Sequence, residues 1–275
     1  MSEVITAVQA ARRALSAQLG GEPVATVSVI DAPVKDTVGR RMLVTAGATE
    51  GSLGSRERDE RAAALAREAL VSGERQLHEV ELEGGTWQLY VEPQSPIPDL
   101  LIIGAGHIAR PLCRLGALLG FRVTVADDRP EFANRQGFPE AAHVELIDFA
   151  DPFTAMEITA NSYVVLVTRG HKYDYDCILQ LLKMNVQPAY LGMIGSRRRV
   201  RAAFEALVAD GADPERLRQV HAPIGLDIGS ETPEEIALAI AAEIVAVRRG
   251  GSGGRLSEQE SVLDRVTRRG SKPSA

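Results

Sequence analysis

The chain has 275 residues, which is enough for two modest domains or one large one. Its 45% hydrophobic and 25% charged residues are ordinary for a soluble globular protein. The net charge of −6 argues against a general nucleic-acid binder, because a phosphate backbone is bound by a basic surface. The sequence shows neither a signal peptide nor an apolar run long enough to span a bilayer. The only cysteines, Cys113 and Cys177, indicate no disulfide framework, and a reducing cytoplasm is the expected location.

Residues 1–92 are predicted to form a small α+β domain. Helical spacing of apolar residues predicts one helix over 4–19, and an alanine- and leucine-rich segment predicts another over 56–71. A glycine-rich stretch at 47–55 separates this second helix from the strands before it. The predicted strands cover 24–30, 42–45, 77–82 and 86–91.

Three prolines within residues 93–98 predict a stiff linker, and strands alternate with helices over 99–249. This alternation predicts a doubly wound parallel, Rossmann-like sheet with helices on both faces. Asp151-Pro152 resembles a helix start, and residues 250–275 form a polar tail typical of disorder. The predicted strands cover 100–103, 122–126, 143–147, 163–168 and 188–191, and the later helices cover 175–185, 197–209 and 232–249.

The segment after the first of these strands carries a dinucleotide-binding fingerprint. Gly104, Gly106 and Ala109 form Gly-x-Gly-x-x-Ala between a buried strand and a helix. The first glycine permits a tight turn, the second lets a pyrophosphate approach the backbone, and the alanine lets the helix pack closely. Asp127 ends the next strand, where a carboxylate meets a ribose hydroxyl in such folds.

Ligands of doubly wound sheets bind at the carboxyl ends of the strands, so polar residues there are candidate site residues. His107 and His171 are the candidate acid–base groups, although either could be an ordinary helix or recognition residue. Thr168 ends the strand before His171. Asp127 as the ribose ligand suits an unphosphorylated 2′-hydroxyl, and Asp128 beside it is a further candidate cofactor-binding residue. The arginine that follows suits a phosphate instead, so the choice between NAD and NADP stays open.

A further strand end reads Gly195-Ser196-Arg197-Arg198, followed by a third arginine. Ser196 is a natural N-cap, but cations at a helix N-terminus oppose the helix dipole. A bound phosphate or carboxylate resolves this conflict, because backbone N–H groups and guanidinium groups both bind anions. The alternative is a solvated basic helix.

The last candidate segment is the loop 221–229, which contains Pro223, Gly225 and Gly229. Its mixture of glycine, proline and apolar residues suits a loop that closes over a ligand, although a structural loop has the same composition. The sequence contains no clustered cysteines and histidines at zinc-ligand spacing, so no metal site is predicted.

Together these motifs resemble the XdhC/CoxI family of xanthine dehydrogenase accessory proteins. The resemblance rests on residues 104–109, 127–129, 171–174, 192–198 and 221–235, and it covers nearly all of 99–249. The small domain resembles the family through Gly51-Ser-Leu-Gly54 and the following helix. Many relatives carry a Gly-Gly-Cys-x-Glu-like motif there, whereas this chain reads Gly54-Ser-Arg-Glu-Arg58, which argues against thiolate capture of molybdenum by that domain.

The resemblance implies an accessory protein that binds the molybdenum cofactor, as molybdopterin or its dinucleotide form. Such a protein assists sulfuration of the cofactor and its insertion into an apo molybdenum hydroxylase of the xanthine or carbon monoxide dehydrogenase type. A sulfurtransferase resembling cysteine desulfurase is the second implied partner, and a homo-oligomer is a further possibility. This implies a cofactor-binding maturation factor rather than a turnover enzyme. Two alternatives stay open: an NAD(P)-dependent oxidoreductase, which rests on the first β-α-β unit alone, and a nucleotide-sensing regulatory module, which needs no catalytic residue.

Overall fold

The computed structural model describes residues 4–184 and 186–258. The chain divides into two compact units, Met1–Ile97 and Pro98–Ala275, and each is described below by itself. Within the described ranges, no helix combines the length and the apolar character needed to cross a membrane.

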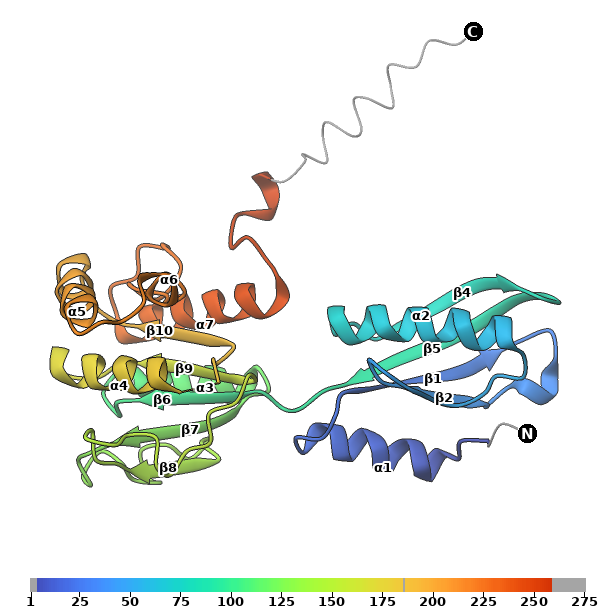
Figure 1. Cartoon of the computed structure of the whole chain (residues 1–275), viewed down its shortest axis with the longest axis horizontal. Helices are drawn as coiled ribbons and strands as arrows, with labels where there is room; N and C mark the ends of the chain where they lie inside the picture. Colours follow the sequence, from blue (N-terminus) through green and yellow to red (C-terminus); the bar gives the residue numbers. More distant parts are fainter. Residues whose placement is uncertain (1–3, 185, 259–275) are drawn as a thin grey trace, which may run out of the picture. The chain divides into compact units, whose positions relative to one another are not determined.

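The first unit is an antiparallel five-stranded sheet with one helix on each face (Figure 1). The strand order is β3-β2-β1-β5-β4. Alternate residues of β1 point to opposite faces, so Ala25, Val27 and Val29 pack under α2 whereas Val24 packs under α1. The elements are α1 (Ala7–Gln18), β1 (Val24–Asp31), β2 (Arg41–Val44), β3 (Thr49–Gly51), α2 (Arg56–Ser72), β4 (Gln76–Leu82) and β5 (Gly85–Gln94).

Two details of the first unit differ from the sequence-based prediction. The glycine-rich stretch contains the short strand β3, which pairs with β2. Strand β5 also continues through Pro93 and Gln94, which pair with Ala25 and Val24 of β1. Strand β5 therefore extends into the range 93–98, which was predicted to be a linker from its prolines, because its last two residues pair with β1 and are buried.

The second unit is a parallel five-stranded sheet, which confirms the predicted α/β fold class. Its order, β8-β7-β6-β9-β10, is the 3-2-1-4-5 order of a Rossmann fold when its strands are counted along the chain. The order reverses between β6 and β9, and ligands of such folds bind at this switch point. The strands are β6 (Asp99–Ile103), β7 (Arg122–Asp127), β8 (His143–Leu146), β9 (Ser162–Leu166) and β10 (Tyr190–Met193).

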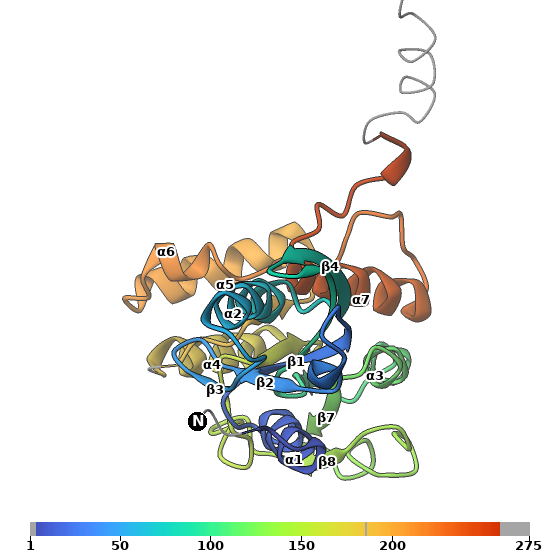
Figure 2. The same ribbon diagram turned by 90° about the vertical axis from the view of Figure 1, so that its right-hand side faces the viewer.

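Helices cover both faces of this sheet (Figure 2). Helices α3 and α7 share one apolar core with β6 and β7, and α4 and α5 share another with the opposite face. Arg248, near the end of α7, lies over the Phe121 ring, which precedes β7. Helix α7 therefore starts at the carboxyl edge of the sheet, as do α3, α4 and α5, which follow strands directly. The helices are α3 (Ala109–Leu118), α4 (His171–Lys183), α5 (Arg197–Ala209), α6 (Pro214–Leu217) and α7 (Pro233–Arg249).

The prediction of a helix that starts at Asp151-Pro152 is wrong, because residues 150–156 form only turns and bends. The chain bends towards β9 almost at once, since the Thr159 N–H donates to Ser162 Oγ at 3.0 Å, and this leaves little room for further helical turns. Of the tail predicted over 250–275, residues 259–275 lie outside the described ranges. Leu256–Glu258 forms a short 3₁₀ turn.

Candidate functional site

The turn after β6 is held open by its glycines. Gly104 has a φ of +108°, and a Cβ there would lie 2.5 Å from the Val167 carbonyl oxygen. Only glycine therefore lets the turns after β6 and β9 come this close. A Cβ on Gly106 would have no atom within 4 Å, so the backbone faces open space. Ala109 is fully buried as the first residue of α3.

Asp127 faces inward rather than towards a ligand. Its side chain is 2% exposed, and its carboxylate accepts hydrogen bonds from the Ala105 N–H at 2.7 Å and from Arg129 Nε at 2.9 Å. Burial raises the pKa of Asp127, but the hydrogen bonds from Arg129 and Ala105 outweigh burial and lower it to about 2. Both oxygens are thus engaged in fixing the glycine turn. This geometry disfavours the ribose-binding role predicted for Asp127.

Asp128 faces the turn after β9. Arg169 donates to both of its oxygens, at 2.6 and 2.8 Å, and also to the Tyr173 hydroxyl at 2.7 Å. Arg169 is not among the predicted site residues, although its position just after β9 places it at the carboxyl edge of the sheet. Asp128 keeps 24% of its side chain exposed, so it is the carboxylate at the end of β7 that a ligand can reach.

Thr168 and Asp174 join α4 to α5 through buried polar contacts. The Thr168 hydroxyl donates to Asp174 Oδ1 at 2.5 Å, and Arg199 forms an ion pair with the other oxygen of Asp174. A Cβ on Gly195 would lie 3.0 Å from Arg199 Cδ, so the missing side chain makes room for the arginine stem. Local sequence does not predict this pair, because its two members lie 25 residues apart.

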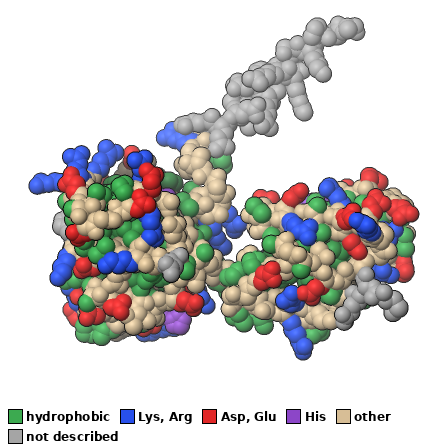
Figure 3. Space-filling view, in the orientation of Figure 1, with side chains coloured by type: hydrophobic (Ala, Val, Ile, Leu, Met, Phe, Trp, Pro, Cys, Tyr) green, Lys and Arg blue, Asp and Glu red, His purple; other side chains and the backbone are tan. Residues whose placement is uncertain are grey.

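Arg197 and Arg198 are exposed in the first turn of α5, with Ser196 as the predicted N-cap. The Ser196 hydroxyl accepts from the Arg199 N–H at 3.3 Å. Neither Arg197 nor Arg198 forms an ion pair with any described residue. Lys and Arg side chains lie over the part of the unit that contains α5 and α6, with Asp and Glu side chains among them (Figure 3). The unfavourable charge at this helix start is thus left uncompensated within the described structure.

The loop 221–229 is anchored on β10 and α7. Residues 221–224 run parallel to β10, with the Ile224 N–H donating to the Met193 carbonyl at 3.1 Å. Glu243 of α7 contacts His221 Nδ1 at 2.6 Å and accepts from the Gly225 N–H. Burial raises the pKa of Glu243, but these hydrogen bonds outweigh it and lower the pKa. An acid among the apolar residues of α7 was the sequence signal for this anchor.

The structure brings four of the predicted segments together at the carboxyl edge. The glycine turn contacts the end of β9, Asp128 pairs with Arg169, and Asp174 pairs with Arg199. The fifth segment leaves β10 at the same edge, where Pro223 and Gly229 are exposed. His107 is exposed beside the glycine turn. His171 begins α4, and its side chain lies outside the described part of the structure.

Comparison with known proteins shows which protein family contains both units of the chain. Residues 100–244 match the XdhC Rossmann domain, and residues 7–81 match the XdhC and CoxI family. The chain belongs to the XdhC/CoxI family. Both units of this XdhC/CoxI protein are thus accounted for by family domains, and its carboxyl-edge segments all lie within the XdhC Rossmann domain.

Two curated proteins are similar to this XdhC/CoxI chain. An uncharacterized Escherichia coli protein, YqeB, is 34% identical over 174 residues, covering 62% of this chain and 31% of YqeB. A protein from Bacillus subtilis, named as a probable subunit of xanthine dehydrogenase, is 30% identical over 164 residues, covering 60% of this chain and 47% of that protein. The chain therefore matches less than half the length of either relative.

A solved structure shares the fold of the XdhC/CoxI chain. The crystal structure described as a xanthine dehydrogenase from Bacillus halodurans has a TM-score of 0.53 and 18% identity. The likeness covers 90% of this chain and 97% of that one. At this level of identity the likeness supports the fold alone.

The Asp127 contacts predict a pH dependence of stability in this XdhC/CoxI protein. The folded pKa of about 2 lies below the reference value of 3.8, so the contribution is fully present above pH 4 and is lost as the pH falls through 2. Asp127→Asn should therefore reduce the free energy of unfolding at neutral pH by about 2 kcal/mol. Urea unfolding at several pH values should show the two proteins converging below pH 4. If the difference in the free energy of unfolding between the two proteins stays the same at every pH, the Asp127 carboxylate does not stabilise the folded state in the way described.

Proposed function

We propose that this chain binds the molybdenum cofactor, as molybdopterin or its dinucleotide form, and assists its sulfuration and insertion into a molybdenum hydroxylase. The family membership supports this proposal, as does the name of the Bacillus subtilis relative, which associates a similar protein with xanthine dehydrogenase. A client of the xanthine or carbon monoxide dehydrogenase type is part of the same proposal.

The observation that carries the proposal is the uncompensated charge at the carboxyl edge. Asp127, Asp128 and Asp174 are each paired there with an arginine. Arg197 and Arg198 have no such partner among the described residues, and they stand at the start of a 13-residue helix. Helix N–H groups and free guanidinium groups together favour a phosphate, which every form of the cofactor carries.

The remaining residues of the edge suit the rest of such a ligand. The open space beside Gly106 lets a second phosphate or a pterin edge approach the backbone. Asp128 and Arg169 offer exposed polar atoms on the other side of the switch point. The loop around Gly225, fixed at its base by Glu243, supplies backbone groups from a third direction. When bound, the cofactor supplies the molybdenum at which an oxo ligand is exchanged for sulfide.

The chain's own cysteines do not suit the transfer of sulfur, which supports a sulfurtransferase as partner. Cys113 and Cys177 are both fully buried inside the second unit. Burial raises the pKa of Cys113 to about 11 and also raises that of Cys177. Because the thiolate is the nucleophile and the metal ligand, neither side chain is available to carry sulfur or to bind molybdenum. A separate sulfurtransferase as the source of the sulfur atom fits these buried thiols.

The binding site is tested with a double variant and a matched control. Arg197→Ala with Arg198→Ala should weaken molybdopterin binding by at least about tenfold, because each charge-assisted contact contributes about 1.5–3 kcal/mol. Arg218→Ala with Arg249→Ala removes the same charge from exposed positions elsewhere and should leave the affinity unchanged. Pterin fluorescence measures both affinities. Equal affinities of the two double variants would assign Arg197 and Arg198 to the solvated surface.

The Rossmann strand order and glycine turn also favour a nicotinamide nucleotide as a second candidate ligand. Asp127 is engaged internally, so Asp128 would have to receive the ribose hydroxyl. Calorimetry with NAD(H) and NADP(H) separates the candidates, since the maturation proposal requires binding of the pterin and not of either nucleotide.

A further inference from the structure

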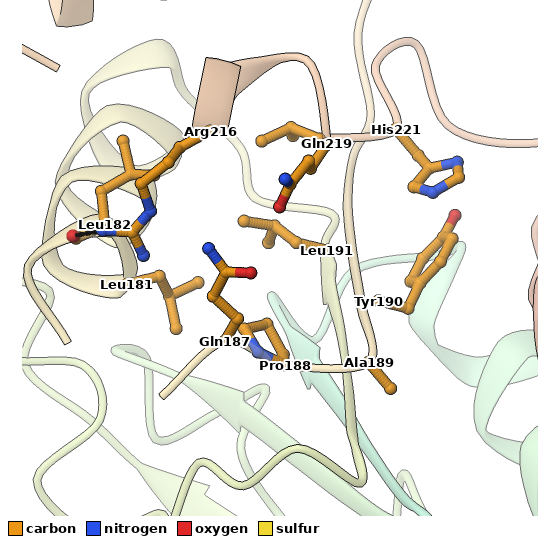
Figure 4. Close-up of a pocket in the computed structure, with 11 residues that line it drawn as sticks. Leu181, Leu182, Gln187, Pro188, Ala189, Tyr190, Leu191, Arg216, Gln219 and His221 are labelled. Carbon is orange, nitrogen blue, oxygen red and sulfur yellow. Dashed lines mark hydrogen bonds between the residues drawn. The ribbon is translucent and has the colours of Figure 1, made fainter. Parts of the chain in front are cut away.

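A cavity of about 340 Å³ lies away from the carboxyl edge (Figure 4). It is lined by the end of α4, the residues just before β10, and α6 with the segment after it. Gln187, Pro188 and Ala189 precede β10, so the cavity lies towards the amino-terminal end of that strand. The proposed cofactor site lies at the opposite end of the same strand, and the cavity is a separate feature.

The cavity combines an apolar wall with one cation. Leu181 and Leu191 are buried on one side, and Gln187 and Gln219 extend exposed amide groups towards the same space (Figure 4). Arg216 is the cation of the lining, which contains no Lys, Asp or Glu. This is the composition of a small-molecule site, in which apolar walls hold the ligand and a few polar groups orient it.

The Arg216 guanidinium is only partly satisfied by the protein. One terminal nitrogen donates to the Leu182 carbonyl, whereas Nε is buried and has no hydrogen-bond partner. In the described ranges no carboxylate pairs with Arg216, although the nearby Arg218 pairs with Glu215. A buried donor without a partner is unfavourable, and a guanidinium group binds a carboxylate with two parallel hydrogen bonds.

We propose that this cavity binds a small organic carboxylate with an apolar body. The carboxylate pairs with Arg216, the apolar body packs on Leu181 and Leu191, and the two glutamines close the mouth. The volume limits the ligand to roughly the size of an aromatic or medium-chain acid. The proposal is independent of the cofactor site, because it uses none of the same side chains.

Calorimetry on the full chain with benzoate and hexanoate as probes tests this site. Both should bind saturably at millimolar concentrations, and benzyl alcohol, which lacks the charge, should bind at least about tenfold more weakly. Arg216→Gln should weaken benzoate binding by at least about tenfold. Arg218→Gln, a nearby exposed arginine, should leave it unchanged.

A second variant, Gln219→Glu, tests the site even if Arg216→Gln fails to fold. Gln219→Glu places a negative charge at the exposed mouth without removing a hydrogen bond to the backbone. It should weaken benzoate binding and leave benzyl alcohol binding unchanged. Failure of benzoate and hexanoate to saturate the wild-type chain overturns the proposal. So does benzoate affinity that is the same in wild type and Gln219→Glu.

Discussion

Gly104→Ala is expected to reduce the free energy of unfolding of the second unit by about 2–5 kcal/mol. The alanine would have to adopt a φ of +108°, which L residues with a Cβ rarely do. Its Cβ would also lie 2.5 Å from the Val167 carbonyl oxygen and 3.1 Å from Thr168 Cα. Both neighbours are backbone atoms at the end of β9, so the two turns would have to separate. Urea unfolding measures the loss.

Gly106→Ala is the matched control, because it lies two residues away in the same turn. A Cβ there meets no atom within 4 Å, so the stability cost should stay below about 1 kcal/mol. The same methyl group would occupy the space assigned to the cofactor and should weaken molybdopterin binding. The two substitutions thus separate a glycine needed for folding from one needed for ligand approach. A similar loss of stability in both variants would contradict this division.

Asp174→Ala is expected to be at least as damaging, with a loss of about 3–5 kcal/mol. Asp174 is fully buried and receives both the Thr168 hydroxyl and the Arg199 guanidinium. Removing the carboxylate leaves the largely buried Arg199 without its counter-charge. The linkage between α4 and α5 depends on this pair, so Arg197 and Arg198 should also lose their fixed position. Thermal and urea unfolding report the stability effect.

Asp176→Ala on the same helix provides the comparison for this prediction. Asp176 is only partly buried and forms no ion pair with a described residue, so its loss should cost less than about 1 kcal/mol. Asp174→Leu combined with Arg199→Met should recover part of the stability, because an apolar pair can replace a buried ion pair. If the Asp174→Ala protein has the same free energy of unfolding as wild type, the Asp174–Arg199 pair contributes nothing to folding stability.

The sequence was sufficient for the architecture of both units because their strands carry strong local signals. The apolar runs at Leu100–Ile103 and Tyr163–Thr168, each followed by a helix, predicted a parallel sheet. The Gly104 turn and the Ser196 cap followed from local stereochemistry, and the structure shows both. Local signals failed at Asp151-Pro152, where capping residues were present but the chain turned towards β9 before a helix could form.

Contacts between distant segments could not be predicted from the same signals. Asp127 matches a ribose ligand by position, yet it binds the Ala105 N–H and Arg129 instead. Local sequence does not reveal which of two consecutive aspartates turns inward, since that depends on the alternation of the strand and the depth of the turn. The Asp174–Arg199 and His221–Glu243 pairs join residues more than twenty positions apart, and only the fold brings them together.

The most direct test of cofactor carriage is the pterin content of the full chain. The wild-type protein, isolated from a host that makes molybdopterin or incubated with a donor protein that carries it, would be separated from the donor and assayed for bound pterin by fluorescence after oxidation. The proposal predicts a stoichiometric amount of pterin on the chain, with no comparable uptake of NAD or NADP. A chain that remains free of pterin beside a loaded donor would contradict it.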